Sequence, residues 1–218
     1  MIGKIAPERS TEQRIPMRYD EFQTRIPENT RAEWTNGEAI LLMPPNIRHQ
    51  DIVAFLLILL RLFVDMKQLG KALGAPCEMR LVAQDSAREP DILFVARANL
   101  TRLTAQRLVG PADLVVEVVS DESATRDRVE KWQEYQAAGV REYWIVDPRP
   151  GKPIVEAWGL DDTGQYRPIA SSVGGTLASS VLPGFWLDRT WLEAEELPNP
   201  LTCFVQIAGP DTLRQALG

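Results

Sequence analysis

Cysteine is scarce in this chain of 218 residues, whose two cysteines, Cys77 and Cys203, lie far apart. Two distant cysteines provide neither a disulfide framework nor a zinc cluster made of cysteines. The chain therefore suits a reducing compartment, and we expect a cytoplasmic protein. Residues 1–16 are polar and lack the apolar core that a secretory signal peptide needs.

A long uncharged apolar run is also missing. The most apolar stretch covers residues 52–60 and is interrupted by Arg61 before residues 62–64 continue it. A membrane-spanning helix needs about 18 or more consecutive apolar residues. We therefore expect no membrane association and predict a helix that is buried on most sides.

The sequence also lacks an excess of positive charge. The chain has 24 Lys and Arg against 30 Asp and Glu, which gives a net charge of −6. This balance disfavours broad, sequence-independent binding to nucleic acid. It leaves room for a local basic groove beside an acidic metal site, so a role on nucleic acid must depend on the site itself.

The residues that are present indicate a soluble globular protein, with 44% hydrophobic and 25% charged residues. The Asn36-Gly37 pair predicts a hairpin turn between strands 32–34 and 38–43. A short helix is expected before this hairpin, and the apolar helix after it. Their predicted ranges are 19–25 for the first and from about 46–49 to 69 for the second.

The middle of the chain alternates between strands and a helix. Residues 113–120 form a nearly continuous apolar strand, which is typical of a sheet covered on both faces. A helix over 123–138 and a strand over 142–146 follow, so a right-handed crossover should make the two strands parallel. Further strands are predicted at 77–83, 91–95, 154–158 and 165–169, and a short helix at 190–196.

These elements predict an α/β fold, a mixed sheet flanked by helices. We expect one domain over residues 17–192, a loose arm over 1–16 and a peripheral C-terminal extension over 193–218.

Glu117 is the most unusual residue of the predicted sheet, because apolar residues precede and follow it in its strand. Burying a carboxylate costs several kcal/mol unless it is paired, hydrogen-bonded or bound to a metal. One interpretation is a glutamate in an edge strand that is paired with an arginine. The other is a functional carboxylate.

Asp91 follows Pro90 at the start of a short apolar strand. By itself, this arrangement is usually turn chemistry. Together with Glu117, however, Asp91 can converge on one hard cation, and carboxylates with waters suit Mg²⁺ or Mn²⁺.

The predicted helix after Glu117 carries Asp127, Lys131 and Tyr135 at a spacing of four residues, which places them on one face. An Asp–Lys pair at this spacing is also a common surface ion pair. Arg126 and Arg128 lie in the first turns, where the helix dipole disfavours positive charge. Either an anion binds nearby or both arginines are solvated.

The run GPADLVVEVVSDESATRDRVEKWQEYQAAGVREYWIVDP, with EPDILFV before it, resembles the Uma-type restriction endonuclease family, a branch of the PD-(D/E)XK nuclease superfamily. The segments EWTNGEAILLMPPNIRHQ and VLPGFWLD extend the resemblance over roughly residues 19–190. The resemblance implies a restriction-endonuclease-like core. It places Asp91 at the metal-binding Asp of the PD motif and Glu117 at the second acidic position, with the backbone carbonyl of Val118 as a further ligand.

The usual lysine of the superfamily would fall at Val119, and in this branch it is taken to have moved to the next helix, here Lys131. Glu38 and His49 also match family positions near the site. Glu38 could hold a second ion or contact the first through water. His49, the only histidine, also fits a structural role at the start of its helix.

The resulting hypothesis is a Mg²⁺-dependent (or Mn²⁺-dependent) endonuclease that acts on DNA. Asp91 and Glu117 hold the metal, Lys131 assists the attacking water, and a homodimer would allow both strands to be cut. The alternative is a nuclease-like fold that serves as a binding or regulatory module.

Overall fold

A central six-stranded sheet organises the computed structural model, which describes residues 13–27, 29–121, 123–152, 154–171 and 175–211. Its strand order is β12-β11-β10-β9-β7-β4, and only the neighbours β9 and β10 are parallel. The strands are β4 (Gly70–Gly74), β7 (Ile92–Ala96), β9 (Leu114–Val118), β10 (Glu142–Val146), β11 (Val155–Leu160) and β12 (Tyr166–Pro168). The predicted mixed sheet and parallel crossover are therefore confirmed.

A second six-stranded sheet, here called the outer sheet, has the order β1-β3-β2-β6-β5-β8. It carries the short helix α1 (Tyr19–Arg25), and its strands are β1 (Gln13–Pro16), β2 (Ala32–Thr35), β3 (Glu38–Leu41), β5 (Glu78–Leu81), β6 (Ser86–Arg88) and β8 (Arg107–Val109). The hairpin of β2 and β3 was predicted. Residues 13–16, predicted as part of a loose arm, instead pair with β3; residues 1–12 lie outside the described residues.

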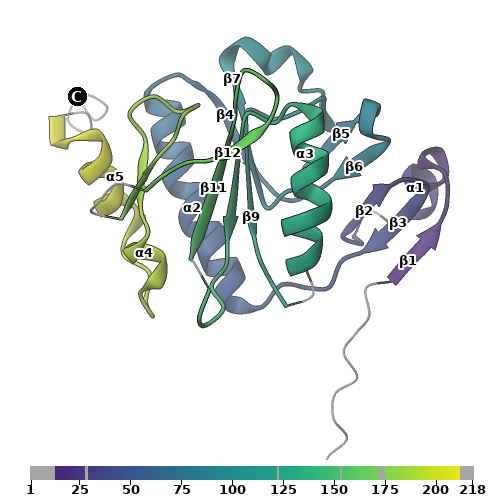
Figure 1. Cartoon of the computed structure of the whole chain (residues 1–218), viewed down its shortest axis with the longest axis horizontal. Coiled ribbons are helices and arrows are strands. Elements are labelled where there is room, and N and C mark those ends of the chain that lie inside the picture. Colours follow the sequence, from purple (N-terminus) through teal and green to yellow (C-terminus); the bar gives the residue numbers. More distant parts are fainter. Residues whose placement is uncertain (1–12, 28, 122, 153, 172–174, 212–218) are drawn as a thin grey trace, which may run out of the picture.

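Helix α2 (Ile47–Met66) covers one face of the central sheet (Figure 1). Asn46 caps its start by accepting a hydrogen bond from the backbone N–H of His49 at 2.8 Å. The helix is apolar on most sides because α5 (Pro200–Ala208) packs on it as well, with Cys203 and Phe204 buried. Within the described ranges, no helix is both long enough and apolar enough to span a membrane.

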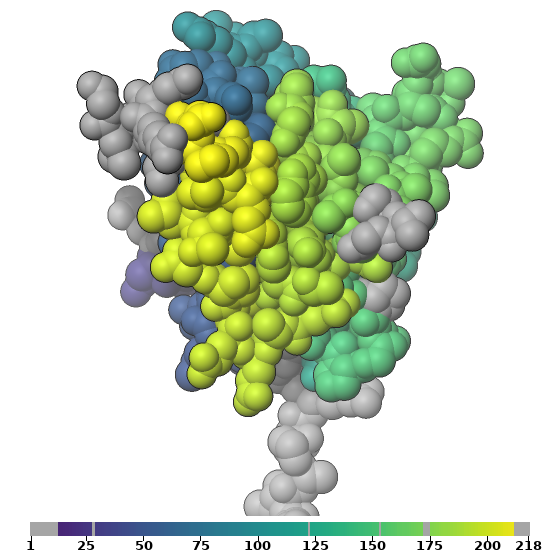
Figure 2. All heavy atoms as spheres, turned by 90° about the vertical axis from the view of Figure 1, so that its left-hand side faces the viewer, coloured from purple at the N-terminus to yellow at the C-terminus, as the bar shows by residue number. Residues whose placement is uncertain are grey.

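Within the predicted peripheral extension, residues 193–211 instead contribute to the core through Cys203 and Phe204, which corrects the prediction for this part; residues 212–218 lie outside the described residues. Figure 2 shows residues 175–211 spread over one side of the molecule. They form the small sheet of β13 (Thr176–Ala178) and β14 (Trp186–Asp188), followed by α4 (Thr190–Glu193) and α5. The apolar face of α5 joins the same buried cluster as α2, so this segment stabilises the fold.

Strand β4 was missed, and α2 was predicted to run to residue 69. A strand of sequence GKALG has low β-propensity, which hides it from the local pattern. Its pairing with β7 depends on Gly70, where an added Cβ would lie 2.1 Å from the carbonyl oxygen of Val95. Residues 99–108, predicted as a helix or loop, contain part of a 3₁₀ segment η2 (Arg97–Arg102) and the start of β8.

The opposite face of the central sheet is covered by α3 (Trp132–Ala138), which also contacts the outer sheet (Figure 1). A π-helical segment, η3 (Arg126–Lys131), precedes α3, so the predicted helix over 123–138 is present but wound more loosely at its start. Val115 and Val119 belong to the cluster beneath α3, whereas Val116 and Val118 belong to the cluster beneath α2. By strand alternation, Glu117 therefore faces α3.

Candidate active site

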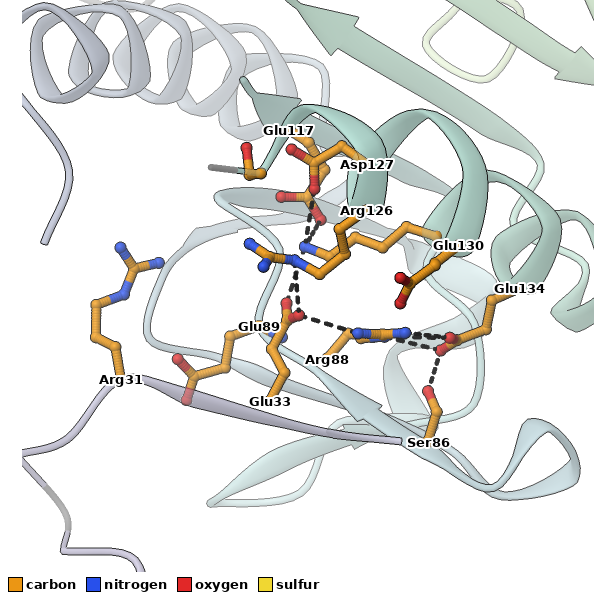
Figure 3. Close-up of polar contacts among 12 residues, drawn as sticks. Arg31, Glu33, Ser86, Arg88, Glu89, Glu117, Arg126, Asp127, Glu130 and Glu134 are labelled. Carbon is orange, nitrogen blue, oxygen red and sulfur yellow. Dashed lines mark hydrogen bonds and ion pairs between the residues drawn. The ribbon is translucent and has the colours of Figure 1, made fainter. Parts of the chain in front are cut away.

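A cavity of about 170 Å³ lies between the two sheets and the start of the helix that follows β9. Asp91, the residue immediately before β7, and Glu117 in β9 both line it. The structure therefore brings these two predicted carboxylates together. Six further charged residues line the same cavity, namely Arg31, Glu33, Glu89, Arg126, Asp127 and Lys131. Figure 3 labels the first five of these together with Glu117.

Glu117 is 3% exposed and is held through its Oε1 atom. This oxygen accepts hydrogen bonds from Lys131 Nζ at 2.8 Å and from the hydroxyl of Tyr135 at 2.9 Å. Strand β9 lies between β7 and β10, and the partner of Glu117 is a lysine. The interpretation as an edge-strand glutamate paired with an arginine is therefore wrong.

More negative charge lies around Glu117 than the ammonium of Lys131 can neutralise. The pKa of Glu117 is raised to about 8, first by burial and then by repulsion from Asp127 and Asp91, which together outweigh the opposing effect of Lys131. Lys131 has a raised pKa, because its carboxylate neighbours more than offset the effect of burial. A carboxyl group that resists ionisation beside a permanent ammonium indicates a place where additional positive charge would be stabilised.

Asp91 is fixed by neighbours on three sides. Its Oδ2 accepts the backbone N–H of Val118 at 2.9 Å, and its Oδ1 lies 3.2 Å from His49 Nε2. The guanidinium of Arg31 is 3.7 Å from the same Oδ1. The bond from Val118, the residue next to Glu117, holds Asp91 against the end of β9. His49 thus contacts a predicted metal ligand, and it also has a structural role because its backbone N–H completes the cap of α2.

The residues present fit a divalent cation of the Mg²⁺ type. Among the residues that the structure describes, no group of three or more His, Cys, Asp or Glu side chains is arranged to hold a metal ion. Asp91 and Glu117 would thus supply two carboxylates. Mg²⁺ commonly binds through one or two carboxylates and keeps several waters, which substrate phosphate oxygens can replace. The raised pKa of Glu117 agrees with a site that gains from such a charge.

The predicted face of Asp127, Lys131 and Tyr135 is buried and points toward Glu117. Lys131 Nζ lies 3.5 Å from Asp127 Oδ1, and both side chains are almost fully buried. The interpretation of this pair as a surface ion pair is therefore wrong. The hydroxyl of Tyr143 donates to the carbonyl of Asp127 at 2.9 Å, within the π-helical turn. Such turns are frequent at functional sites.

Glu38 and Arg128 lie away from the cavity. Glu38 is at the first position of β3, its side chain is 41% exposed, and it lies 3.8 Å from Arg14. Arg128 pairs with Asp147 at 3.0 Å and contacts Glu156. Of the two arginines at the start of the helix, only Arg126 lines the cavity, so the geometry offers support for an anion site at that residue alone.

Arg31, Glu33 and Glu89 line the cavity although the sequence did not indicate them, and Glu33 is fully buried. Glu33 lies in β2, and its Oε1 is 2.8 Å from Lys131 Nζ. A glutamate between Ala32 and Trp34 in a hairpin strand is expected on the solvent face, because apolar and polar residues usually alternate along the strands of antiparallel sheets. Only the packing of η3 and α3 against the outer sheet buries it, and no local pattern signals this contact.

The raised pKa of Glu117 predicts how stability depends on pH. Between about pH 4.5, the ordinary value, and about pH 8, the folded protein holds a proton that the unfolded chain has released. The free energy of unfolding should therefore decrease as the pH rises through this window. Urea unfolding at pH 5 and pH 8, with a chelator present, should show a larger loss for wild type than for Glu117→Gln. Equal losses would contradict the assignment.

The comparisons with known proteins concern the family and the fold of the chain. The model of the Uma2 family, whose description is "Putative restriction endonuclease", matches residues 19–190. This chain belongs to that family. The family match covers all of the residues that line the cavity.

A solved structure from Anabaena variabilis, a "putative nuclease belonging to DUF820", is similar to this chain with a TM-score of 0.61 and 17% identity. The similarity covers 82% of this chain and 98% of the other. At this identity the likeness concerns the fold, and it confirms the predicted restriction-endonuclease-like core. No curated protein matches the chain.

Proposed function

We propose that this Uma2-family protein is a metal-dependent endonuclease that hydrolyses phosphodiester bonds in DNA. The observation that carries the proposal is the buried contact of 2.8 Å between Lys131 and Glu117, in a cavity that Asp91 also lines. The family membership and the nuclease description of the similar solved structure support the reaction class.

Asp91 and Glu117 would hold Mg²⁺ or Mn²⁺. Such an ion, when bound, makes water a better nucleophile and neutralises charge on the phosphoryl oxygens. Lys131 keeps its proton and directs its ammonium toward the same region, where it can orient the water or stabilise negative charge in the transition state. His49 and the backbone N–H of Val118 keep the Asp91 carboxylate in position.

A second candidate is a nuclease-like fold that binds nucleic acid without cutting it. The net charge of −6 favours a weak or regulatory contact over tight, general binding. This candidate predicts that a metal binds without cleavage, so an activity measurement separates the two.

Metal binding should raise the melting temperature, because a ligand that binds only the folded state stabilises it. We expect a rise for wild type with Mg²⁺ or Mn²⁺, and no rise for Asp91→Ala, measured by calorimetry or dye fluorescence. Asp113→Ala is a matched control, because Asp113 is buried elsewhere and binds Asn99 and the backbone of Ala96. It should keep the metal-dependent rise. An equal rise in Asp91→Ala would contradict the metal site.

We also propose a homodimer, because cutting both strands of a duplex requires two active sites. The two distant cysteines favour a cytoplasmic location. Sedimentation velocity on the full chain tests the dimer: a monomer at the concentration of the cleavage assay would contradict it.

A further inference from the structure

Three carboxylates lie within 3.5 Å of the Lys131 ammonium, those of Glu117, Glu33 and Asp127, and of the two closest only Glu117 belongs to the proposed metal site. Nζ lies 2.8 Å from Glu117 Oε1 and 2.8 Å from Glu33 Oε1. Glu33 comes from the outer sheet and Glu117 from the central sheet, so Lys131 bridges the two sheets. If Glu117 turns toward a cation, Glu33 remains as the close partner of the ammonium.

Glu33 is itself held rigidly. Its Oε2 accepts from Arg88 Nη1 at 3.1 Å, and its Oε1 accepts from the backbone N–H of Glu89 at 3.2 Å. Arg88 also binds Glu134 of α3 through two nitrogens, with a shortest distance of 2.6 Å (Figure 3). The chain of contacts from Glu33 through Arg88 to Glu134 fixes β2 and β6 against the helix that carries Lys131.

The charge of Glu33 is secure as well. Burial disfavours its ionised form, but Lys131, Arg88 and Arg126 lower the pKa of Glu33 to about 2. Glu33 is therefore an anion throughout the neutral range.

We infer that Glu33 is a positioning residue for Lys131, which fixes the ammonium beside Glu117 from the outer sheet. This inference rests on the proposed function. Glu33 acts through Lys131, because its carboxylate contacts Lys131, Arg88, Arg126 and a backbone N–H, and neither Asp91 nor Glu117 is among its contacts. A displacement of a catalytic group by about 1 Å can reduce a rate by about 100-fold.

A double-mutant cycle tests the inference. The rate of DNA cleavage with Mn²⁺ is measured for wild type, Glu33→Gln, Lys131→Met and the double variant. Glu33→Gln keeps the shape of the side chain and removes its charge. We expect kcat to fall by about 100-fold, while KM for DNA and the Mn²⁺ midpoint stay within about threefold of wild type. In the Lys131→Met background, Glu33→Gln should have no further effect on kcat.

The matched control is Glu142→Gln, another fully buried glutamate, in β10 and distant from the cavity lining. Its carboxylate accepts from Trp144 Nε1 at 2.6 Å and from the backbone N–H of Ser180 at 2.7 Å. Its loss should lower the melting temperature and leave kcat unchanged. A general effect of losing a buried charge would lower kcat in both variants.

Each outcome decides something different. Additive losses in the double variant, or an undiminished kcat in folded Glu33→Gln, would overturn the positioning role. If Glu33→Gln fails to fold, Glu33→Asp takes its place in the cycle. We then expect an intermediate loss of kcat, because aspartate keeps the carboxylate but its shorter side chain holds it farther from Lys131. Absence of cleavage by wild type would instead contradict the proposed function, and a Mn²⁺ midpoint altered in Glu33→Gln would show that Glu33 belongs to the metal site.

Discussion

Arg88→Ala should destabilise the protein by about 3–5 kcal/mol, the cost typical of breaking a buried ion pair by removing one partner. Arg88 is 1% exposed and joins Glu33 of β2 to Glu134 of α3, and Glu134 also contacts the Ser86 hydroxyl. Without the guanidinium, two carboxylates lose a close cation. For a domain of this size the loss corresponds to a decrease in melting temperature of roughly 6–20 °C.

Urea unfolding followed by circular dichroism measures this loss. Arg167→Ala is the control, because Arg167 pairs with Asp161 at 2.8 Å on the surface, with 69% of its side chain exposed. Surface pairs contribute about 0–1 kcal/mol. A loss for Arg88→Ala that is no larger than that of Arg167→Ala would mean that the contact between the outer sheet and α3 does not depend on this arginine.

Lys131→Met should reduce the rate of DNA cleavage by about 100- to 1000-fold, the range found when one group that stabilises transition-state charge is removed. Methionine retains an apolar side chain of similar length, so most of the packing in the buried site is kept. The side chains of Asp91 and Glu117 remain, and Mn²⁺ should still raise the melting temperature. Loss of cleavage with retained metal binding would separate the role of the lysine from that of the ligands.

Single-turnover cleavage of a labelled oligonucleotide with Mn²⁺ is the appropriate measurement. Lys71→Met is the control, because Lys71 is exposed in β4 and does not line the cavity. This variant should cleave at the wild-type rate. Full activity in Lys131→Met would contradict the role of Lys131, and loss of both activity and the metal-dependent rise would indicate that Lys131 instead maintains the site's structure.

Most strands of the central sheet and the β2–β3 hairpin of the outer sheet could be predicted from the sequence, because their signals are local. The continuous apolar strand around Glu117, the Asn36-Gly37 turn and the glycine at position 139 each leave a clear mark on the chain. Position 139 has φ of 86°, as a helix C′ glycine requires. The Uma-type resemblance then placed Asp91 and Glu117 in one site, and the structure brings them to one cavity.

Glu33 and the short strands of both sheets could not be predicted in the same way. Strands β4, β6 and β8 have three to five residues each, too short for a reliable period. Glu33 is buried by a helix about a hundred residues later in the chain, and such long-range packing has no local signature. The resemblance pointed to Glu38, but the turn at Asn36-Gly37 places that residue near Arg14 and outside the cavity.

The central claim is that Asp91, Glu117 and Lys131 form one metal-dependent nuclease site. Its most direct test is the cleavage of plasmid and single-stranded DNA by wild type and Glu117→Ala, with Mn²⁺ and with a chelator. We expect cleavage by wild type with Mn²⁺ alone, and none by folded Glu117→Ala. Cleavage that persists undiminished in Glu117→Ala, or that is independent of the metal, would contradict the claim.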